Sequence, residues 1–223
     1  MSSFLNNISD KIPVELRQEY ALLCGTVLNL REKWLNYNYL YGHSQERVEV
    51  LNKCGSTFFN MVQSLFLDDF ISTLSRLTDP AEKFGSNLSL EQLINKIIEL
   101  DQNSNADIIF QLRGSLERLR EKTSAMRKHR NKRIAHTDYE IAIKFEEALP
   151  GISRKNIEEA LEEAETFLRL FYFHFTKITF FHDELKLWQG AEVLWTKLAK
   201  ARANEEFDQL GTVPHNSWRK FKD

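Results

Sequence analysis

The feature that most constrains this chain is an apolar helical stripe that runs directly into a run of cationic residues. Apolar side chains recur every three or four residues over 108–126, which is the spacing of one face of an α-helix. The positions of this apolar stripe are Ile108, Ile109, Leu112, Leu116, Leu119, Thr123 and Met126. The same spacing continues to Arg130, where a guanidinium stands in place of an apolar side chain. Because charged side chains are rarely buried without a partner, either the stripe ends at Met126 or Arg130 points into a polar cleft between helices.

Long helices are predicted along most of the chain. Only 8 Gly and 4 Pro occur in 223 residues, which is few for a fold rich in turns, while 16 Phe and 4 Trp supply a substantial core. Capping residues and apolar periodicity predict helices at about 14–39, 45–77, 90–100, 106–135, 156–187 and 191–206. We therefore predict an all-α fold, an antiparallel helical bundle of four to five long helices with short accessory helices.

The sequence divides into a helical bundle, 1–188, and a C-terminal helical extension with a basic tail, 189–223. The two cysteines, Cys24 and Cys54, form no CxxC pattern and are expected to be ordinary thiols in a reducing cytoplasm. No signal peptide is visible, and charged residues interrupt the most apolar window, 167–181. We therefore expect a cytoplasmic protein without a membrane segment, in which the window is the central helix of the bundle or a subunit interface.

Positive charge is concentrated in one segment, Met126–Asp138, which we call the basic motif. It holds five Lys/Arg and two His in thirteen residues of a chain whose formal net charge is −2. From Arg113 to His136 the chain has nine Lys/Arg against two Glu, so the remainder is acidic. Such a concentration favours a localised contact with a polyanion such as RNA. The alternative is a solvent-exposed helix face that is paired with acidic neighbours.

Two residues of the basic motif have the chemistry of RNA cleavage, but a regular helix would separate them. His136 follows Arg130 by six residues, which is about 240° of rotation on an α-helix. The two side chains converge if the helix ends near Ala135, or if a second copy of the chain supplies the partner. Thr137 and Asp138 favour such a break, because both compete for backbone hydrogen bonds.

The residues 130–136, Arg-Asn-Lys-Arg-Ile-Ala-His, resemble the signature of HEPN domains, in which an Arg and usually a polar residue precede a His. The segment 75–80, Ser-Arg-Leu-Thr-Asp-Pro, and an Asp two residues after the His make the chain most similar to the AbiU-like, abortive-infection branch. The resemblance covers roughly residues 45–185. It implies an RNA endonuclease that needs no metal or other cofactor, with a site shared across a homodimer. It also implies a role as a toxin or in phage defence, with an antitoxin or regulatory protein as a possible partner.

The same resemblance assigns roles to individual residues. Arg130 would stabilise the phosphate, His136 would transfer protons, and Asn131 would orient one of them or bind the phosphate. Residues assigned to RNA contact are Arg127, Lys128, Lys132 and Arg133. Residues assigned supporting roles are Arg76, Asp79 and Asp138. Either aspartate would hold the imidazole tautomer, and Arg76 has the alternative role of an ion-pair partner for Asp79 or Glu82.

Cleavage of RNA without a metal needs a base for the 2′-hydroxyl, donors for the phosphoryl oxygens and an acid for the leaving 5′-oxygen. Histidine suits both proton transfers, and arginine suits the oxygens. Because one such His per chain leaves one group missing, a two-fold dimer is expected to supply the second. His129 and His136 have no Cys or acidic ligand at a suitable spacing, so no zinc site is expected. The alternative function is a non-catalytic helical module that binds RNA or another protein.

Overall fold

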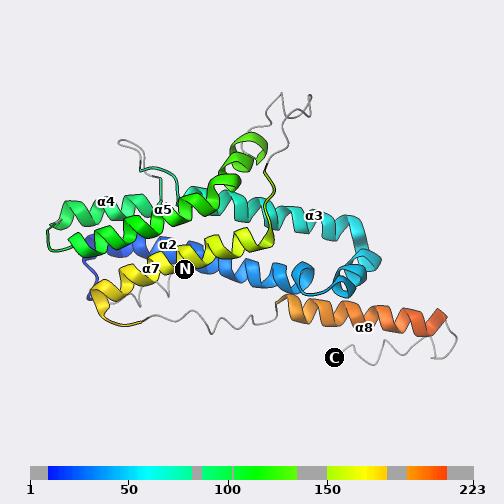
Figure 1. Cartoon of the computed structure of the whole chain (residues 1–223). Coiled ribbons are helices and arrows are strands. Elements are labelled where there is room, and N and C mark those ends of the chain that lie inside the picture. The colour runs from blue at the N-terminus through cyan, green and yellow to red at the C-terminus, as the bar shows by residue number, and fades with distance from the viewer. Residues whose placement is uncertain (1–9, 82–86, 102, 135–149, 180–189, 210–223) are drawn as a thin grey trace. The chain divides into compact units, whose positions relative to one another are not determined.

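The computed structural model describes residues 10–81, 87–101, 103–134, 150–179 and 190–209. Every regular element in these residues is a helix, which confirms the predicted all-α class (Figure 1). In chain order the elements are α2 (Val14–Tyr37), η1 (Asn38–Gly42), α3 (Gln45–Leu77), α4 (Leu90–Asp101), α5 (Ala106–His129), η2 (Arg130–Ile134), α7 (Arg154–Thr176) and α8 (Ala191–Gln209).

The chain forms two compact units, each of which is discontinuous in sequence. The first contains Met1–Arg31 and Leu67–Glu184, and the second contains Glu32–Phe66 and Leu185–Asp223. The described part of the basic motif belongs to the first unit. The predicted boundary between residues 188 and 189 lies outside the described residues, so the division at that point stays a prediction.

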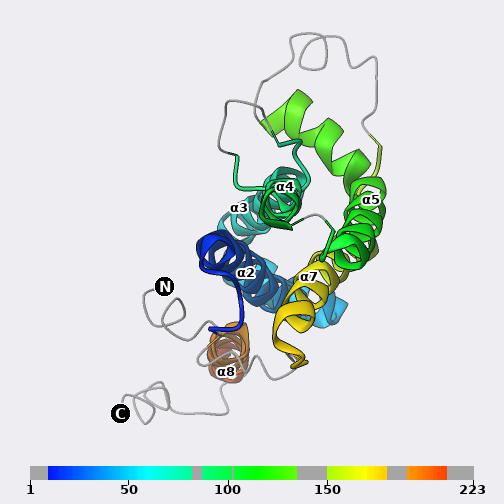
Figure 2. The same cartoon turned by 90° about the vertical axis from the view of Figure 1, so that its left-hand side faces the viewer.

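In the first unit, α5 lies beside both α4 and α7 (Figure 2). Three pairs show their relative direction: Asn105, just before α5, with His174 at 3.1 Å, Ser115 with Glu163 at 2.7 Å and Lys122 with Glu159 at 3.5 Å. Residue numbers rise along α5 while they fall along α7, so the two helices are antiparallel.

The apolar stripe of α5 forms the centre of this unit. All seven of its predicted positions are buried, and Leu112, Leu119 and Met126 are fully inaccessible to solvent. The predicted apolar face of α7 is buried as well, from Ile157 to Ala164. Burial of these side chains is the main favourable term that holds the helices together.

Polar and aromatic contacts join α2 to α7 within the same unit. The guanidinium of Arg31 donates to both carboxylate oxygens of Glu165 and to Glu158. Burial alone would lower the pKa of Arg31, but these hydrogen bonds raise it above its ordinary value. The ring of Tyr20 stacks on that of Phe171, with centroids 4.6 Å apart.

The ends of α7 differ in how well the sequence predicted them. At its start, Ser153 and Asn156 form a reciprocal capping box, so the predicted Ser153 cap is confirmed. At its end, the predicted extension to residue 187 is wrong, because α7 ends at Thr176. Lys177 adopts a left-handed conformation with φ 59°, and its N–H donates to the carbonyl of Phe173. Residues of the apolar window after 179 lie outside the described residues.

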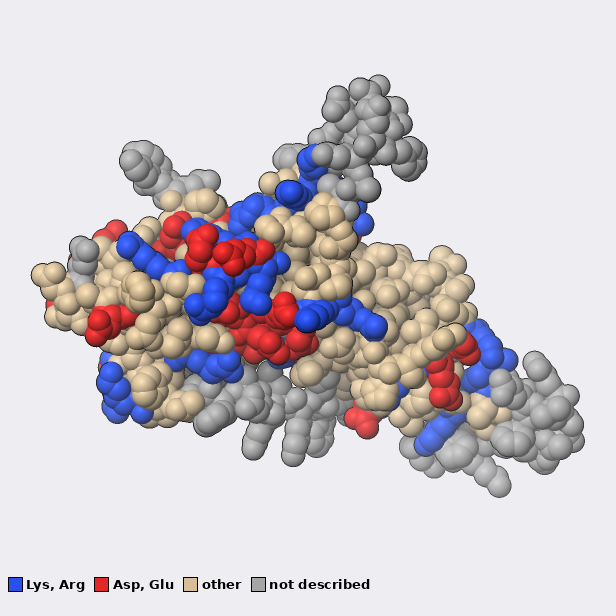
Figure 3. Space-filling model, viewed as in Figure 1, with Lys and Arg blue, Asp and Glu red and all other residues tan. Residues whose placement is uncertain are grey.

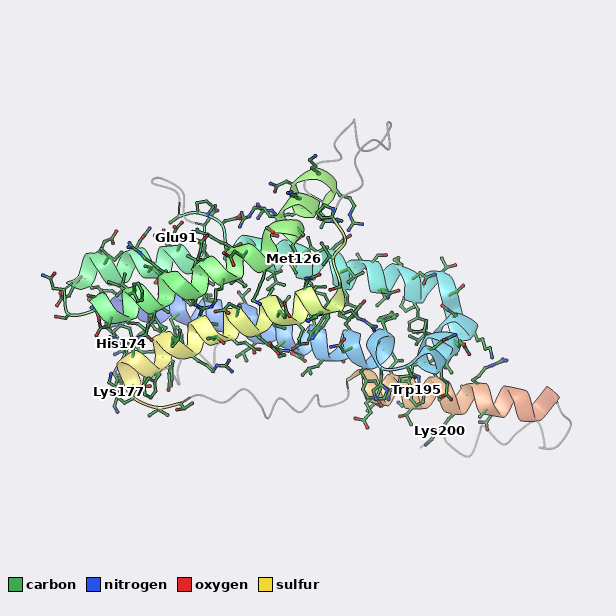
Figure 4. The ribbon with its side chains drawn as sticks, viewed as in Figure 1. Glu91, Met126, His174, Lys177, Trp195 and Lys200 are labelled. Carbon is green, nitrogen blue, oxygen red and sulfur yellow. The ribbon has the colours of Figure 1, made fainter. Side chains whose placement is uncertain are left out.

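The second unit is built on the turn between α2 and α3. This turn, η1, is π-helical and packs against α8. The hydroxyl of Tyr41 donates to the carbonyl of Phe59 at 2.9 Å. The guanidinium of Arg47 lies 3.8 Å from the ring centroid of Tyr39 and 5.0 Å from that of Trp195, which α8 contributes (Figure 4).

Candidate active site

The ends of α3 and α5 meet at the candidate site. α3 ends at Leu77, and Thr78-Asp79 form a turn before Pro80, as predicted from the restriction that a proline places on the residue before it. The hydroxyls of Thr78 and Thr123 lie 3.4 Å apart, which brings the end of α3 beside the last turns of α5. Both hydroxyls are buried, so this contact is part of the core.

The carboxylate of Asp79 lies between two guanidinium groups. Its Oδ1 accepts from Nη1 of Arg127 at 2.6 Å, and its Oδ2 accepts from Nη1 of Arg130 at 2.7 Å. The side chains are 14%, 29% and 21% exposed, respectively, so water screens the charges only in part. We call these three residues the Asp79 cluster. Because one carboxylate neutralises only one of two cations, the cluster keeps a net positive charge.

The guanidinium of Arg127 is held by the end of α3. Besides its bond to Asp79, it donates from Nη2 to the hydroxyl of Thr78 at 2.5 Å and to the carbonyl of Ser75 at 3.3 Å. These contacts give Arg127 a structural role in joining α5 to α3. Its predicted contact with RNA stays a prediction.

The guanidinium of Arg130 has fewer partners. Nε donates to Oδ1 of the exposed Asn131 at 3.1 Å, and Nη1 donates to Asp79, while Nη2 makes no hydrogen bond to a described residue. The apolar stripe therefore ends at Met126, and Arg130 lies in a polar contact between α3 and α5. Figure 4 shows Met126 just before the point where α5 gives way to η2.

The helix changes type within the basic motif. α5 ends at His129, and Arg130–Ile134 continue as the π-helical turn η2, which contains no buried residue. π-Helical turns are rare and often occur at functional sites. A helix was predicted to about residue 135, and the described chain is helical to residue 134. Its last turn, however, is π-helical and not α-helical.

The other cations of the basic motif differ in their surroundings. Arg133 pairs with Asp68 of α3 at 2.5 Å, and both side chains are about half exposed. Lys128 is exposed and makes no hydrogen bond or ion pair with a described residue. Lys132 is half-buried. No single surface role therefore fits all four cations that were assigned to RNA contact.

Arg76 does not pair with Asp79, contrary to one of the two expectations for it. Its side chain is exposed and makes no bond to any residue that the structure describes, whereas both oxygens of Asp79 are taken by arginines of the basic motif. Its other expected partner, Glu82, lies outside the described residues. The supporting role of Arg76 stays a prediction.

Sequence reasoning missed Arg120 and Glu91, which extend the site toward α4. Nη2 of Arg120 lies 3.2 Å from Oε2 of Glu91, and its Nε donates to the carbonyl of Thr78 at 3.4 Å. Glu91 stands at the start of α4 and also accepts from the backbone N–H of Ala81 (Figure 4). The spacing of seven residues between Arg120 and Arg127 was a signal for a shared helix face.

A cavity of about 270 Å³ between α4 and α5 is lined by Glu91, Ile94, Asn95, Arg113, Leu116, Glu117 and Arg120.

Much of the positive charge on α5 is paired with acidic residues of α7. Arg118 pairs with Glu163 at 2.9 Å, and Lys122 pairs with Glu159 at 3.5 Å. Burial alone would raise the pKa of Glu163, but hydrogen bonds from Arg118 and Ser115 lower it below its ordinary value. Figure 3 shows acidic and basic side chains interleaved over α4, α5 and α7, with basic side chains continuing to the end of α5. The paired-face alternative therefore describes the middle of α5.

The structure describes one of the two histidines of the basic motif, His129. Nε2 of His129 lies 2.7 Å from the carbonyl of Pro150, and a carbonyl requires that this nitrogen carry the proton. Nδ1 of the same ring is buried without a hydrogen-bond partner among the described residues. His136 and Asp138, which were assigned catalytic and supporting roles, lie outside the described residues.

Neither a metal centre nor a membrane span is found in the described part of the chain. No group of three or more His, Cys, Asp or Glu residues there is arranged to hold a metal ion. No helix there has the length and the apolar character that crossing a bilayer requires.

Comparison with known proteins agrees with the resemblance in the basic motif. The sequence profile of AbiU2, a family of HEPN domains, matches residues 11–187, so the likeness begins well before the expected residue 45 and includes α2. No curated protein and no solved structure matches the chain. Because the profile covers most of the sequence, we conclude that this protein belongs to the AbiU2 family of HEPN domains.

Proposed function

We propose that this protein is a metal-independent RNA endonuclease, acting as a toxin or in phage defence, with a site shared by two copies of the chain. The observation that carries the proposal is the Asp79 cluster, in which the guanidinium of Arg130 is held by an ion pair, surplus positive charge remains, and Nη2 has no described partner. A fixed guanidinium with a spare donor suits the charge that develops on phosphoryl oxygens. Membership of the HEPN family supports the same function.

The proposed reaction uses His136 for proton transfer. A neutral imidazole takes the proton from a ribose 2′-hydroxyl, and the resulting oxygen attacks the adjacent phosphorus. The bond between phosphorus and the 5′-oxygen breaks, and a second imidazole, in its protonated form, gives a proton to that oxygen. The products are a 2′,3′-cyclic phosphate and a 5′-hydroxyl.

The second imidazole comes from the second copy in this proposal. A base that has just accepted a proton on one side of the phosphorus is poorly placed to deliver it on the other side. A two-fold homodimer duplicates every residue, so two copies of Arg130 and His136 supply one base, one acid and two guanidinium groups.

The surrounding residues take the roles that their chemistry allows. Lys128, Lys132 and Arg133 contact the RNA backbone, together with any donor that Arg127 retains. Asn131 orients Arg130. Asp138 holds the tautomer of the imidazole, and Arg76, whose backbone carbonyl accepts from Asp79, has a supporting role. The partners are therefore RNA, a second copy of the chain and an antitoxin or other regulatory protein that silences it.

The test is incubation of the purified full-length protein with total RNA in EDTA. Wild type is expected to release fragments with 2′,3′-cyclic phosphate ends. Arg130→Ala and His136→Ala are each expected to lower the rate by about a hundredfold or more, because each removes a group that acts on the transition state. Matched controls are Arg17→Ala, an arginine of α2 that pairs with Asp10, and His43→Ala, an exposed histidine of the second unit. Both controls are expected to cleave like wild type.

Two outcomes would contradict the proposal. Cleavage that survives His136→Ala rejects this site. RNA binding that weakens with salt, without products from wild type, identifies the non-catalytic module instead. The toxin role is tested by expression in a bacterial host. Wild type is expected to arrest growth, and His136→Ala is expected not to.

A further inference from the structure

We infer that Asp79 positions Arg130 and that, together with Asn131, it leaves Nη2 of this guanidinium as the donor for the scissile phosphate. The inference rests on the proposed function, in which Arg130 binds that phosphate. The family resemblance offered Asp79 or Asp138 for the imidazole of His136, but both carboxylate oxygens of Asp79 are already taken by arginines. Asp79 is thus a positioning residue of the arginine.

The hydrogen bonds of Arg130 fix both the place and the plane of its guanidinium. The group is planar and carries five N–H donors in a rigid fork. Asp79 accepts from Nη1 at 2.7 Å, and Asn131 accepts from Nε at 3.1 Å. Nε and Nη1 are two of the three nitrogens bonded to Cζ, so the two acceptors together prevent the planar group from turning. Three of the five N–H groups remain for a phosphoryl oxygen, namely both of those on Nη2 and the second one on Nη1.

Asp79 is itself held in place. Its backbone N–H donates to the carbonyl of Arg76 at 3.1 Å, and its other carboxylate oxygen accepts from Arg127. Arg127 is anchored in turn by Ser75 and Thr78 of the same α3 end. The carboxylate that meets Arg130 is therefore part of a connected set of bonds between α3 and α5.

The count of charges explains how a carboxylate can sit beside a phosphate-binding arginine. A single Asp–Arg pair would be neutral and would offer little attraction to RNA. In the Asp79 cluster two guanidinium groups share one carboxylate, so net positive charge remains. The pair of Asp68 with Arg133 is the contrasting case, because it is one-to-one and its side chains are 41% and 52% exposed.

The test compares Asp79→Asn with Asp68→Asn in the full-length protein. Asp79→Asn keeps the shape of the side chain but removes the charge that holds Arg130. We expect kcat to fall by about ten- to a hundredfold, because a small misplacement of a catalytic group has effects of that size. KM is expected to stay the same or fall, because one negative charge has left the RNA site. Asp68→Asn likewise removes a carboxylate charge, the one that pairs with Arg133. This variant is expected to change kcat by about twofold at most.

A second variant, Asp79→Glu, distinguishes misplacement of Arg130 from loss of the folded structure. Asp79→Glu keeps the charge but moves it by one methylene, so it is expected to fold and bind RNA while kcat falls. Affinity is measured with an RNA oligonucleotide whose 2′-hydroxyls are methylated, which the proposed chemistry cannot cleave. A purely structural role for Asp79 predicts instead that a lower melting temperature and weaker RNA binding accompany any loss of rate.

A further readout does not depend on cleavage. In nuclear magnetic resonance spectra, the Nε–H of Arg130, assigned with Arg130→Lys, is expected to exchange slowly with water in wild type and faster in Asp79→Asn. If wild type cleaves no RNA, the proposed function fails and this exchange rate alone decides the positioning role. Wild-type kcat in Asp79→Asn, or an unchanged exchange rate, overturns the inference.

Discussion

The two cysteines show how strongly local surroundings set the chemistry of a residue. Cys24 is 1% exposed in the core of the first unit, whereas Cys54 is exposed in the second. Burial raises the pKa of the Cys24 thiol to about 12, against a smaller opposing effect of the hydrogen bond with Tyr20. The folded chain thus keeps Cys24 in its neutral form.

We predict that a single thiol per native chain reacts with iodoacetamide near pH 8, and that Cys54→Ser abolishes the reaction. The thiolate is the reactive form, and Cys24 has almost none at this pH. The raised pKa also means that its contribution to stability is complete below the unfolded-state value of about 9 and is lost as the pH rises toward 12. Mass spectrometry of the alkylated protein identifies the thiol, and modification of Cys24 before unfolding would contradict the prediction.

At the scale of residues, the sequence located Arg130, Asn131 and Asp79 but not the pairing of Arg130 with Asp79. The break in the apolar stripe is a local pattern, so periodicity alone draws attention to that position. The pairing with Asp79 joins residues that are far apart in sequence and depends on how α3 and α5 pack. The same limit explains why Glu91 was missed, although the helical spacing of Arg120 and Arg127 indicated a shared face.

At the scale of elements, α7 shows that apolar periodicity does not by itself fix where a helix ends. The apolar residues continue past Thr176, and no glycine marks the stop. Lys177 nevertheless adopts a left-handed conformation, and the hydroxyl of Thr176 accepts from the N–H of Ile178 at 3.1 Å. A left-handed conformation is unfavourable by about 1–2 kcal/mol for a residue with a Cβ.

We predict opposite effects for two substitutions at Lys177. Lys177→Gly relieves the backbone strain and is expected to raise the free energy of unfolding by up to about 1 kcal/mol, part of the gain being offset by the freedom of glycine in the unfolded chain. Lys177→Val is expected to lower it by about 1–2 kcal/mol, because a β-branched residue tolerates this conformation poorly. Urea denaturation measures both values. Equal stability of the two variants would show that the left-handed turn is absent in solution.

Element boundaries set by local signals were predicted well. α3 begins and ends at the residues expected, 45 and 77, because a serine precedes it and a proline follows it closely. The π-helical form of η2 was not predicted, because no residue type specifies such a turn and its arginines pair with Asp68 of α3 and with Asp79 in the turn that follows α3.

At the scale of the whole molecule, the all-α class could be read from helical periodicity and the scarcity of glycine and proline. The division into two units could not. It depends on contacts between segments as distant as Met1–Arg31 and Leu67–Glu184, which no local pattern records. The charge balance also needed the structure, because the acidic partners of α5 lie on α7 and α4.

The proposed shared site makes a quantitative prediction about mixed dimers. If wild type and His136→Ala are mixed in equal amounts and allowed to re-associate, about half of the dimers contain one chain of each kind. When one site needs both imidazoles, only wild-type dimers cleave, and the rate falls to about a quarter of that of an all-wild-type sample. Independent sites in each chain give about a half. Cleavage of labelled RNA after re-association distinguishes the two values, and mass measurement confirms that subunits have exchanged.

The π-helical turn η2 shows that the number of backbone residues in the basic motif, and not only its side chains, affects the geometry of the site. Its bonds span five residues where an α-helix spans four, so the turn is an α-helix that carries one surplus residue. Deleting one residue between Arg130 and Ile134 would restore the regular ladder and swing the outgoing chain by about 100°. The number of residues in η2 therefore sets the direction in which the chain leaves Arg130.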